Sequence, residues 1–287
     1  MKNFKRVLAT LLMLVMLMQP FATAASVTEF LDFPNDWSTE AMTAAVENGL
    51  LIGNGNRLIE PNRNLRRSEL AAIITRAFGA TITADIGHFD DVKPGEWYYN
   101  AVSEALQMGA MSGTSPSTFH PDKSVTREEV FTTLARVLCI EGTDVSVLDR
   151  FSDKGEISDW ALASVIGLVE NGYIDGYPNG TLDPRGDMTR AELAQMFHNL
   201  FKTYIDTAGY HSHVNAEGSV IVRAPGAHLE NVTINGDLII ADGVGAGDFD
   251  LNSVTVNGRI LARGGEGKVT FKKVTQLKML LSLTETA

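Results

Sequence analysis

The stretch Met188-Thr189-Arg190-Ala191-Glu192-Leu193 decides the fold, because it occurs three times in the chain. Its counterparts are residues 125–130, Val-Thr-Arg-Glu-Glu-Val, and residues 65–70, Leu-Arg-Arg-Ser-Glu-Leu. A Trp lies 30 residues before each signature Arg, and Gly and Pro also recur at fixed distances from each Trp without a gap. Such an internal repeat indicates three supersecondary units that stack on one another.

Each repeat is expected to contain two helices around a loop. Apolar residues after each Trp follow helical spacing up to a Gly, which suits a left-handed helix end. The second helix begins at the signature, where Thr126-x-x-Glu129 and Thr189-x-x-Glu192 form capping boxes. The first repeat keeps Glu69 but has Arg66 in place of the capping Thr. Because one helical pair cannot enclose the apolar stripe of its second helix, we predict a pseudo-threefold bundle with three grooves.

The signature arginines, Arg67, Arg127 and Arg190, occupy the first turn of these second helices. A cation there opposes the helix dipole, so it is poorly placed for stability. Free backbone N–H groups, the positive helix end and a guanidinium fork would instead converge on one anion. The alternative is that each Arg pairs with an acid of its own or a neighbouring repeat.

Three tryptophans, Trp37, Trp97 and Trp160, stand near the starts of the first helices. A Trp in that position is usually a core residue, so we expect burial first, with stacking on a sugar face as the alternative. Each repeat also opens with Phe-x-Asp, and these acids are expected to cap helices. They are Asp32, Asp91 and Asp153.

The repeats resemble the S-layer homology domain. The resemblance rests on the Phe-x-Asp, the Trp, the Gly pair, the apolar-x-Pro and the apolar-Thr-Arg-Ala-Glu signature. That module occurs in threes and anchors exported proteins to bacterial cell walls, and the resemblance covers about residues 27–205. It implies a protein of the cell wall or S-layer that binds a secondary cell-wall polysaccharide attached to peptidoglycan. The polymer would be anionic and carry a pyruvate ketal on its terminal sugar. The binding residues that follow are Arg67, Arg127, Arg190, Thr126, Thr189, Trp37, Trp97 and Trp160, with Glu69, Glu129 and Glu192 supporting the helix caps.

The start of the chain has the pattern of an export signal. Lys2, Lys5 and Arg6 precede a short apolar run, and the small-residue site Ala22-Thr23-Ala24 follows it. We expect cleavage and a mature protein outside the membrane, a retained anchor being the alternative. Loss of the three cations takes the formal net charge from −11 to −14, which disfavours nucleic acid as a partner. Self-association at the cell surface stays open.

The region after the repeats changes character, being rich in Gly and β-branched residues. Asn231-Val232-Thr233-Ile234-Asn235-Gly236 recurs 22 residues later as Ser253-Val254-Thr255-Val256-Asn257-Gly258, which suits one coil of a β-solenoid. The predicted fold class is therefore mainly α, followed by a small all-β, solenoid-like C-terminal region. The expected organisation is a signal peptide (1–25), repeats (26–80, 86–141 and 148–205), a solenoid-like region (214–276) and an irregular or truncated tail (277–287).

Two classes of function remain. The favoured one is a non-catalytic anchor without a cofactor, and the alternative is a cell-surface polysaccharide lyase or hydrolase, because β-solenoids carry such activities. The tail has too few coils to gather acids and bases on one face, so no catalytic residue is assigned. Neither His211-x-His213 nor the acids of the loop 175–183 have the spacing of a metal site.

Overall fold

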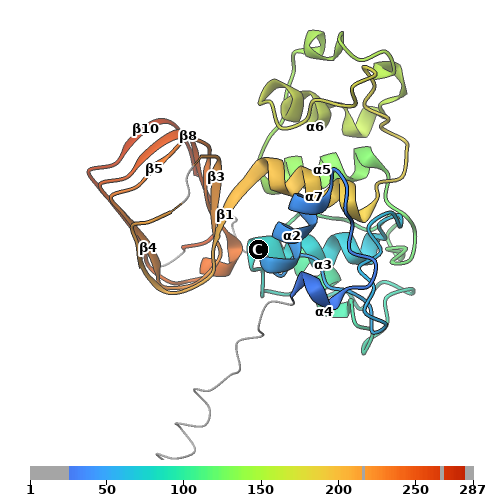
Figure 1. The fold of residues 1–287 in the computed structure, drawn as a ribbon, viewed down its shortest axis with the longest axis horizontal. Coiled ribbons are helices and arrows are strands. Elements are labelled where there is room, and N and C mark those ends of the chain that lie inside the picture. Colours follow the sequence, from blue (N-terminus) through green and yellow to red (C-terminus); the bar gives the residue numbers. More distant parts are fainter. Residues whose placement is uncertain (1–25, 215–216, 266–267, 282–287) are drawn as a thin grey trace, which may run out of the picture.

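The computed structural model describes residues 26–214, 217–265 and 268–281, as a helical body followed by an all-β body (Figure 1). The expected signal peptide, residues 1–25, lies outside the described residues. Within them, each repeat contributes two α-helices: α2 (Thr39–Glu47) and α3 (Arg67–Phe78), α4 (Tyr99–Gln107) and α5 (Arg127–Val137), α6 (Asp159–Glu170) and α7 (Arg190–Leu200). Short 3-10 turns accompany them at η1 (Val27–Glu29), η2 (Val145–Leu148) and η3 (Lys154–Glu156).

The helices pack across the boundaries between repeats. The second helix of each repeat packs against the first helix of the next, α3 on α4 and α5 on α6. The pairing of α7 with α2 closes the ring, and Figure 1 shows these two helices side by side. Apolar residues of all six helices belong to one hydrophobic core. The predicted mainly α bundle of three repeats is confirmed.

Three backbone hydrogen bonds close a cycle at the centre of the bundle. Leu65 N–H donates to the Met188 carbonyl (2.8 Å), Met188 N–H to Val125 (3.0 Å), and Val125 N–H to Leu65 (2.9 Å). These are the first residues of the three signatures, and all are fully buried. A cyclic set in which each repeat donates to one neighbour and accepts from the other is what a pseudo-threefold arrangement requires.

The first helices end where the sequence predicts. Gly49, Gly109 and Gly172 follow the last helical residues with φ values of 68°, 70° and 70°. This left-handed conformation is strained for residues with a Cβ atom, so a Gly reverses the chain here at little cost. The chain then enters the loop that leads to the signature.

The all-β body is a solenoid of parallel strands in two sheets. One sheet has the order β1-β3-β6-β8-β10, with β5 also on β8, and the other has the order β2-β4-β7-β9. Register partners in the middle coil are 22 residues apart, as in Thr233 with Thr255. The strands are β1 (Phe201–Ile205), β2 (Gly209–His211), β3 (Ser219–Val222), β4 (Ala227–Glu230), β5 (Thr233–Ile234), β6 (Leu238–Ile240), β7 (Phe249–Asn252), β8 (Thr255–Ala262), β9 (Val269–Lys272) and β10 (Thr275–Leu281), with η4 at Asp242–Val244.

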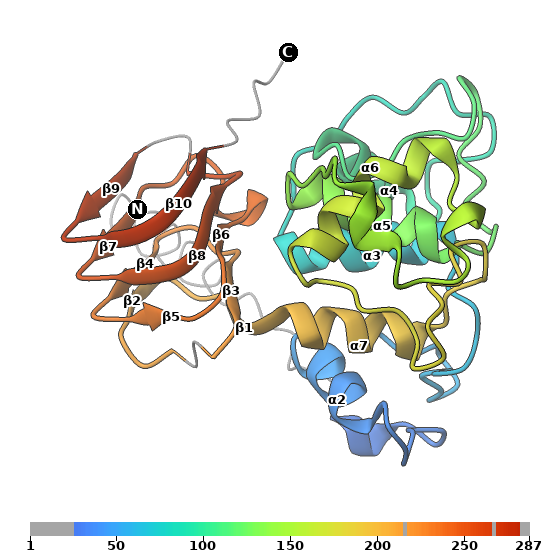
Figure 2. The same ribbon diagram turned by 90° about the horizontal axis from the view of Figure 1, so that it is seen from above.

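The solenoid is longer at both ends than the expected range 214–276. Its first strand begins at Phe201, directly after α7, as Figure 2 shows. Phe201 packs edge-on against Phe78 and Phe197, so burial rather than a turn residue fixes this junction. Strand β10 occupies part of the segment 277–287 that we expected to be irregular, because its backbone pairs with β8. Residues 282–287 lie outside the described part of the chain.

The solenoid is docked on the helical body. Ile221, Ile239 and Leu261 belong to the hydrophobic core of the helices, whereas neighbouring residues of the same strands belong to the core of the solenoid. Arg223 donates to the carbonyls of Arg76 (2.9 Å) and Asn48 (2.8 Å), at the ends of α3 and α2. A cation at the C-terminal end of a helix meets unpaired carbonyls and the negative end of the helix dipole.

Arg263 makes the most buried contact of this kind. It pairs with Asp242 through two bonds (2.8 and 3.1 Å) and donates to the carbonyls of Met108 (2.7 Å) and Val137 (3.4 Å). The helices α4 and α5 end at these carbonyls. Arg263 therefore joins the solenoid to both helices of the second repeat.

We predict that Arg263→Ala lowers the free energy of unfolding by roughly 1–3 kcal/mol, because it leaves the half-buried Asp242 carboxylate and two helix ends without their donor. The control is Lys154→Ala, which removes an exposed pair with Asp149 and should cost less than about 1 kcal/mol. Chemical denaturation of both variants measures the difference. Equal small losses would contradict the docking of the solenoid on the helices.

Candidate functional site

Each signature Arg is buried between its own repeat and the next one. Arg190 is 4% exposed. Its Nε donates to the Ile59 carbonyl (2.9 Å), and its terminal nitrogens donate to Glu69 (2.9 Å) and to the Ile52 carbonyl (3.0 Å). The third repeat is thereby tied to the first. Equivalent ties run from Arg67 to Phe119, Ser112 and Glu129, and from Arg127 to Leu182 and Glu192.

The backbone N–H groups at these helix starts are not free, contrary to our expectation. The N–H groups of Arg190 and Ala191 donate to the carbonyls of Arg63 (3.1 Å) and Pro61 (2.9 Å) in the first repeat. The other two signatures make the matching bonds to their neighbouring repeats. An anion site of free helix N–H groups is therefore wrong for this chain. Pairing of each Arg with an acid of a neighbouring repeat, the alternative, is observed.

The Thr and Glu of the signature form the predicted capping boxes. Thr126 Oγ1 accepts from Glu129 N–H (3.4 Å), and the Glu129 carboxylate accepts from Thr126 N–H (2.9 Å). Thr189 and Glu192 do the same at the third signature. In the first repeat Glu69 accepts from the Arg66 N–H (2.9 Å), but the Arg66 side chain has no acceptor to complete the box. Arg66 instead pairs with the exposed Asp122 at 3.2 Å.

The acids of Phe-x-Asp hold a loop and not a helix start. Asp32 accepts from the N–H groups of Ile59 (2.7 Å) and Glu60 (2.8 Å), and Glu60 has a left-handed φ of 52°. Our expectation of helix caps was wrong, because the partners lie 27 and 28 residues further on. The acid fixes the turn whose Ile59 carbonyl receives Arg190. The same bonds link Asp91 to Phe119 and His120, and Asp153 to Leu182 and Asp183.

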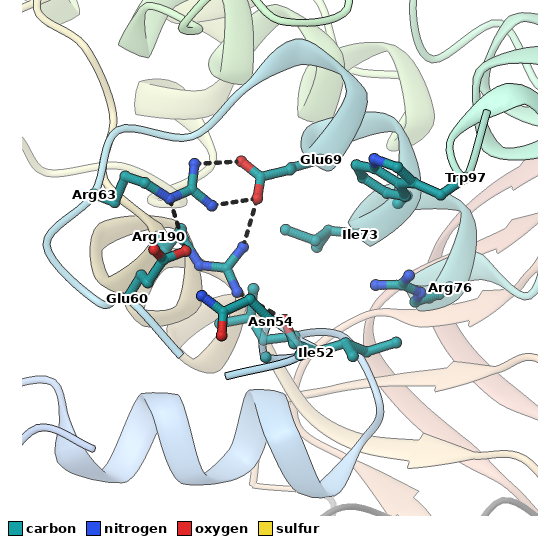
Figure 3. Close-up of a pocket in the computed structure, with 13 residues that line it drawn as sticks. Ile52, Asn54, Glu60, Arg63, Glu69, Ile73, Arg76, Trp97 and Arg190 are labelled. Carbon is teal, nitrogen blue, oxygen red and sulfur yellow. Dashed lines mark hydrogen bonds and ion pairs between the residues drawn. The ribbon is translucent and has the colours of Figure 1, made fainter. Parts of the chain in front are cut away.

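Three grooves lie at the junctions, and each is lined by residues of all three repeats. Groove 1, with a cavity volume of about 430 Å³, combines Arg190 of the third repeat, Trp97 of the second and a wall from the first. Figure 3 shows Arg63 and Arg190 on two sides of Glu69, with Trp97 and Arg76 across the hollow. Cavities of this size accommodate small ligands.

The other two grooves have the same composition, with each repeat contributing a different part. Groove 2 (about 530 Å³) has Arg67 of the first repeat, the wall 111–114 with α5 of the second, and Trp160 of the third. Groove 3 (about 590 Å³) has Arg127 of the second repeat, the wall 172–178 with α7 of the third, and Trp37 of the first. Every groove therefore holds one signature Arg, one signature Glu and one Trp.

The three tryptophans are exposed, so the expectation of core residues was wrong. Trp37, Trp97 and Trp160 are 60%, 62% and 57% exposed, and each forms part of a groove rim. Their role in stacking on a sugar stays a prediction. Thr126 and Thr189 are absent from the residues that line the three grooves, since their hydroxyls lie at the helix caps.

Grooves 1 and 2 contain further cations that the sequence analysis did not predict, and we call them the accessory cations. Arg63 and Arg76 line groove 1, and Lys123 and Arg136 line groove 2. The repeat register contains the signal, because these pairs stand 26 and 39 residues after their Trp. Groove 3 has Arg127 beside Glu192 and Asp175, so its titratable groups are mainly acidic.

The comparisons with known proteins agree with this geometry. The family model of the S-layer homology domain matches residues 29–71, 88–131 and 150–194. The chain therefore carries three tandem S-layer homology domains. Such domains bind a polymer of the cell wall, and the proteins that carry them are anchored at the cell surface, in S-layers or in the cell wall.

Several relatives share this part of the chain. A surface-layer 125 kDa protein of Lysinibacillus sphaericus is 30% identical over 199 residues, 68% of this chain and 17% of the relative. A cellulosome-anchoring protein of Acetivibrio thermocellus is 32% identical over 161 residues, 52% of this chain and 34% of the relative. An amylopullulanase of Thermoanaerobacterium thermosulfurigenes is 30% identical over 176 residues, 60% of this chain and 9% of the relative. The chain thus spans only a minor part of each of these relatives.

Residues 26–214, 217–265 and 268–281 contain neither a membrane-spanning helix nor a metal-binding cluster. No helix there has the length and apolar character needed to cross a membrane. Nor do three or more His, Cys, Asp or Glu side chains gather there in a way that would hold a metal ion.

We predict that Thr126→Ala and Thr189→Ala each lower the free energy of unfolding by about 0.5–2 kcal/mol, through loss of the helix cap. Arg66→Ala at the same register should change it by less than about 0.5 kcal/mol, because Arg66 provides no cap. Thermal or urea unfolding compares the three variants. An Arg66→Ala loss equal to the two Thr losses would refute this reading of the repeats.

Acid should weaken the tie between the third and first repeats. Burial acts against ionisation of Glu69, but its bonds to Arg63 and the Arg66 N–H and the charge of Arg190 hold its pKa below the usual 4.5. A lowered pKa contributes stability above the unfolded-state pKa and loses it as the pH falls through the folded-state pKa. Glu69→Gln should therefore flatten the fall in melting temperature below about pH 5. Glu47→Gln, at an exposed position of α2, is the control and should keep the wild-type slope.

Proposed function

We propose that the chain is a non-catalytic anchor that holds an anionic, pyruvylated secondary cell-wall polysaccharide in the grooves between its repeats. One observation carries this proposal. Grooves 1 and 2 each bring an exposed Trp and two accessory cations to a hollow whose floor is a buried Arg paired with a half-buried Glu. Apolar ring faces beside cations suit a sugar that bears a carboxylate.

The signature Arg and the accessory cations have different tasks in this proposal. Arg190 donates hydrogen bonds to Ile59, Ile52 and Glu69, so it forms the floor of groove 1 and joins the third repeat to the first. Arg76 stands at the side of groove 1 nearest Trp97 (Figure 3). A sugar lying on Trp97 would present its carboxylate to Arg76, whose planar fork engages both oxygens. Lys123 and Arg136 would take this part beside Trp160.

Local geometry must supply this binding, because the chain as a whole is acidic. Its formal net charge is −11, which repels an anionic polymer at long range. The repulsion is overcome only where cations are concentrated, as they are in grooves 1 and 2. Association of copies of the chain at the cell surface stays a prediction.

Co-sedimentation of the mature chain with purified sacculi tests the proposal. We expect binding to walls that retain their secondary polymer and loss of binding after that polymer is extracted. Equal binding to both wall preparations would contradict the proposal. New reducing ends or unsaturated products from the polymer would favour the alternative, a polysaccharide-active enzyme, which the amylopullulanase relative alone does not establish.

Arg76→Ala and Arg136→Ala should each weaken binding to pyruvylated polymer roughly 10- to 100-fold, the loss of a hydrogen bond to a charged group. Arg76→Lys should weaken binding less than Arg76→Ala does, but its affinity should stay below that of the wild type, because an ammonium lacks the planar fork. Arg66→Ala is the control, since Arg66 is an exposed cation outside the grooves. Affinities come from calorimetric titration with soluble polymer.

The ketal and the Arg should act as one unit. After removal of the pyruvate, Arg76→Ala should cost little more than the removal itself, as expected for two groups in contact. Fully additive losses would place the carboxylate elsewhere.

A further inference from the structure

Groove 3 differs from the other two at four register positions. Tyr173 stands where the other repeats have Leu50 and Ala110, and Tyr177 where they have Asn54 and Thr114. The accessory cations are also missing. Gly186 replaces Arg63 and Lys123, and Asn199 replaces Arg76 and Arg136. The third repeat thus exchanges two cations for two aromatic rings.

One of these exchanges places an aromatic ring over the signature Arg of groove 3. The Arg127 guanidinium lies 4.3 Å from the centre of the Tyr177 ring and 5.3 Å from that of Phe131. The Tyr177 hydroxyl donates to Glu192, the partner of Arg127. Burial and the bond to Glu192 raise the pKa of Tyr177 to about 12, so the hydroxyl stays protonated at neutral pH. The Arg127 guanidinium thus faces the Tyr177 ring and the Glu192 carboxylate, and among the described residues the groove lining adds no other Lys or Arg to hold an anionic ligand.

Backbone geometry places Tyr177 there. Gly176 has a left-handed φ of 73°, whereas Gly53 and Gly113, which occupy the same register position in the other repeats, do not have a positive φ. The loop of the third repeat therefore turns differently at this point. The ring of Tyr177 comes to lie over Arg127, whereas Asn54 at the same register stands beside Arg190 in groove 1.

The solenoid supports the second ring of groove 3. The Tyr173 hydroxyl donates to Asp237, and Arg259 pairs with the same carboxylate through two bonds (2.7 and 3.1 Å). Arg259 also reaches the Leu138 carbonyl at the end of α5 (3.3 Å). The all-β body thus fixes the hydroxyl end of Tyr173, while the same side chain lines groove 3.

We propose that groove 3 is a subsite for an uncharged sugar unit, while grooves 1 and 2 take the acid-bearing units. Trp37 and Tyr177 supply apolar faces for a sugar ring, and the amides of Gln195 and Asn199 supply donors and acceptors for its hydroxyls. This assignment rests on the proposed function and divides it among the grooves.

The test uses the full mature chain and two ligands: soluble pyruvylated wall polymer, and the same polymer after mild acid has removed the ketal. The wild type should keep measurable affinity for the ketal-free polymer. Tyr177→Asn, which installs the residue of the first repeat, should lower that residual affinity roughly tenfold, the value of a lost aromatic contact. Trp37→Ala should do the same from another repeat, and being an exposed position it serves if Tyr177→Asn fails to fold.

A gain of function provides the second arm. Asn199→Arg restores the cation of the other repeats and should raise affinity for the pyruvylated polymer while leaving affinity for the ketal-free polymer unimproved. Residual affinity untouched by both Tyr177→Asn and Trp37→Ala, or no residual affinity in the wild type, overturns the subsite. Absence of binding to either polymer by the wild type overturns the proposed function itself.

Discussion

The structure depends on the buried guanidinium of each signature Arg, whose partners lie in the next repeat. A buried charge without partners is strongly destabilising, and carbonyls alone leave it uncompensated. Arg190 therefore needs both the Ile59 carbonyl and the Glu69 carboxylate, and an isolated third repeat provides neither. The cycle of three such ties makes the repeats mutually dependent. It also explains why every groove contains residues of all three repeats.

Local features were predictable from the sequence, and long-range partners were not. The capping box of Thr126 and Glu129 spans four residues, so its pattern alone revealed it. The bond between Arg190 and Ile59 joins residues 131 positions apart, and the acids that hold the loops lie 27 to 30 residues from their partners. The position of Trp97 near a helix start predicted burial, but Trp97 is exposed because it lies at the rim of a groove. The accessory cations were present in the repeat register, because Arg76 and Arg136 occupy equivalent positions.

The solenoid belongs to the same body as the anchor repeats. Its arginines Arg223, Arg259 and Arg263 reach helix ends of the first and second repeats, where carbonyls and helix dipoles favour a cation. Through Asp237 it also holds Tyr173 of groove 3. The docked sheet therefore fixes the side of the bundle that faces away from the helix starts. A period of 22 residues predicted coils, but not that one sheet would face the helices.

Crystallography of the chain with the pyruvylated terminal sugar of the wall polymer tests the central claim most directly. The account predicts sugar in grooves 1 and 2, with a ring face on Trp97 or Trp160 and the carboxylate beside Arg76 or Arg136. The Arg–Glu floors should keep their bonds to the neighbouring repeat when the sugar is bound. Sugar bound away from the grooves, or bound only after an Arg–Glu tie has opened, would contradict it.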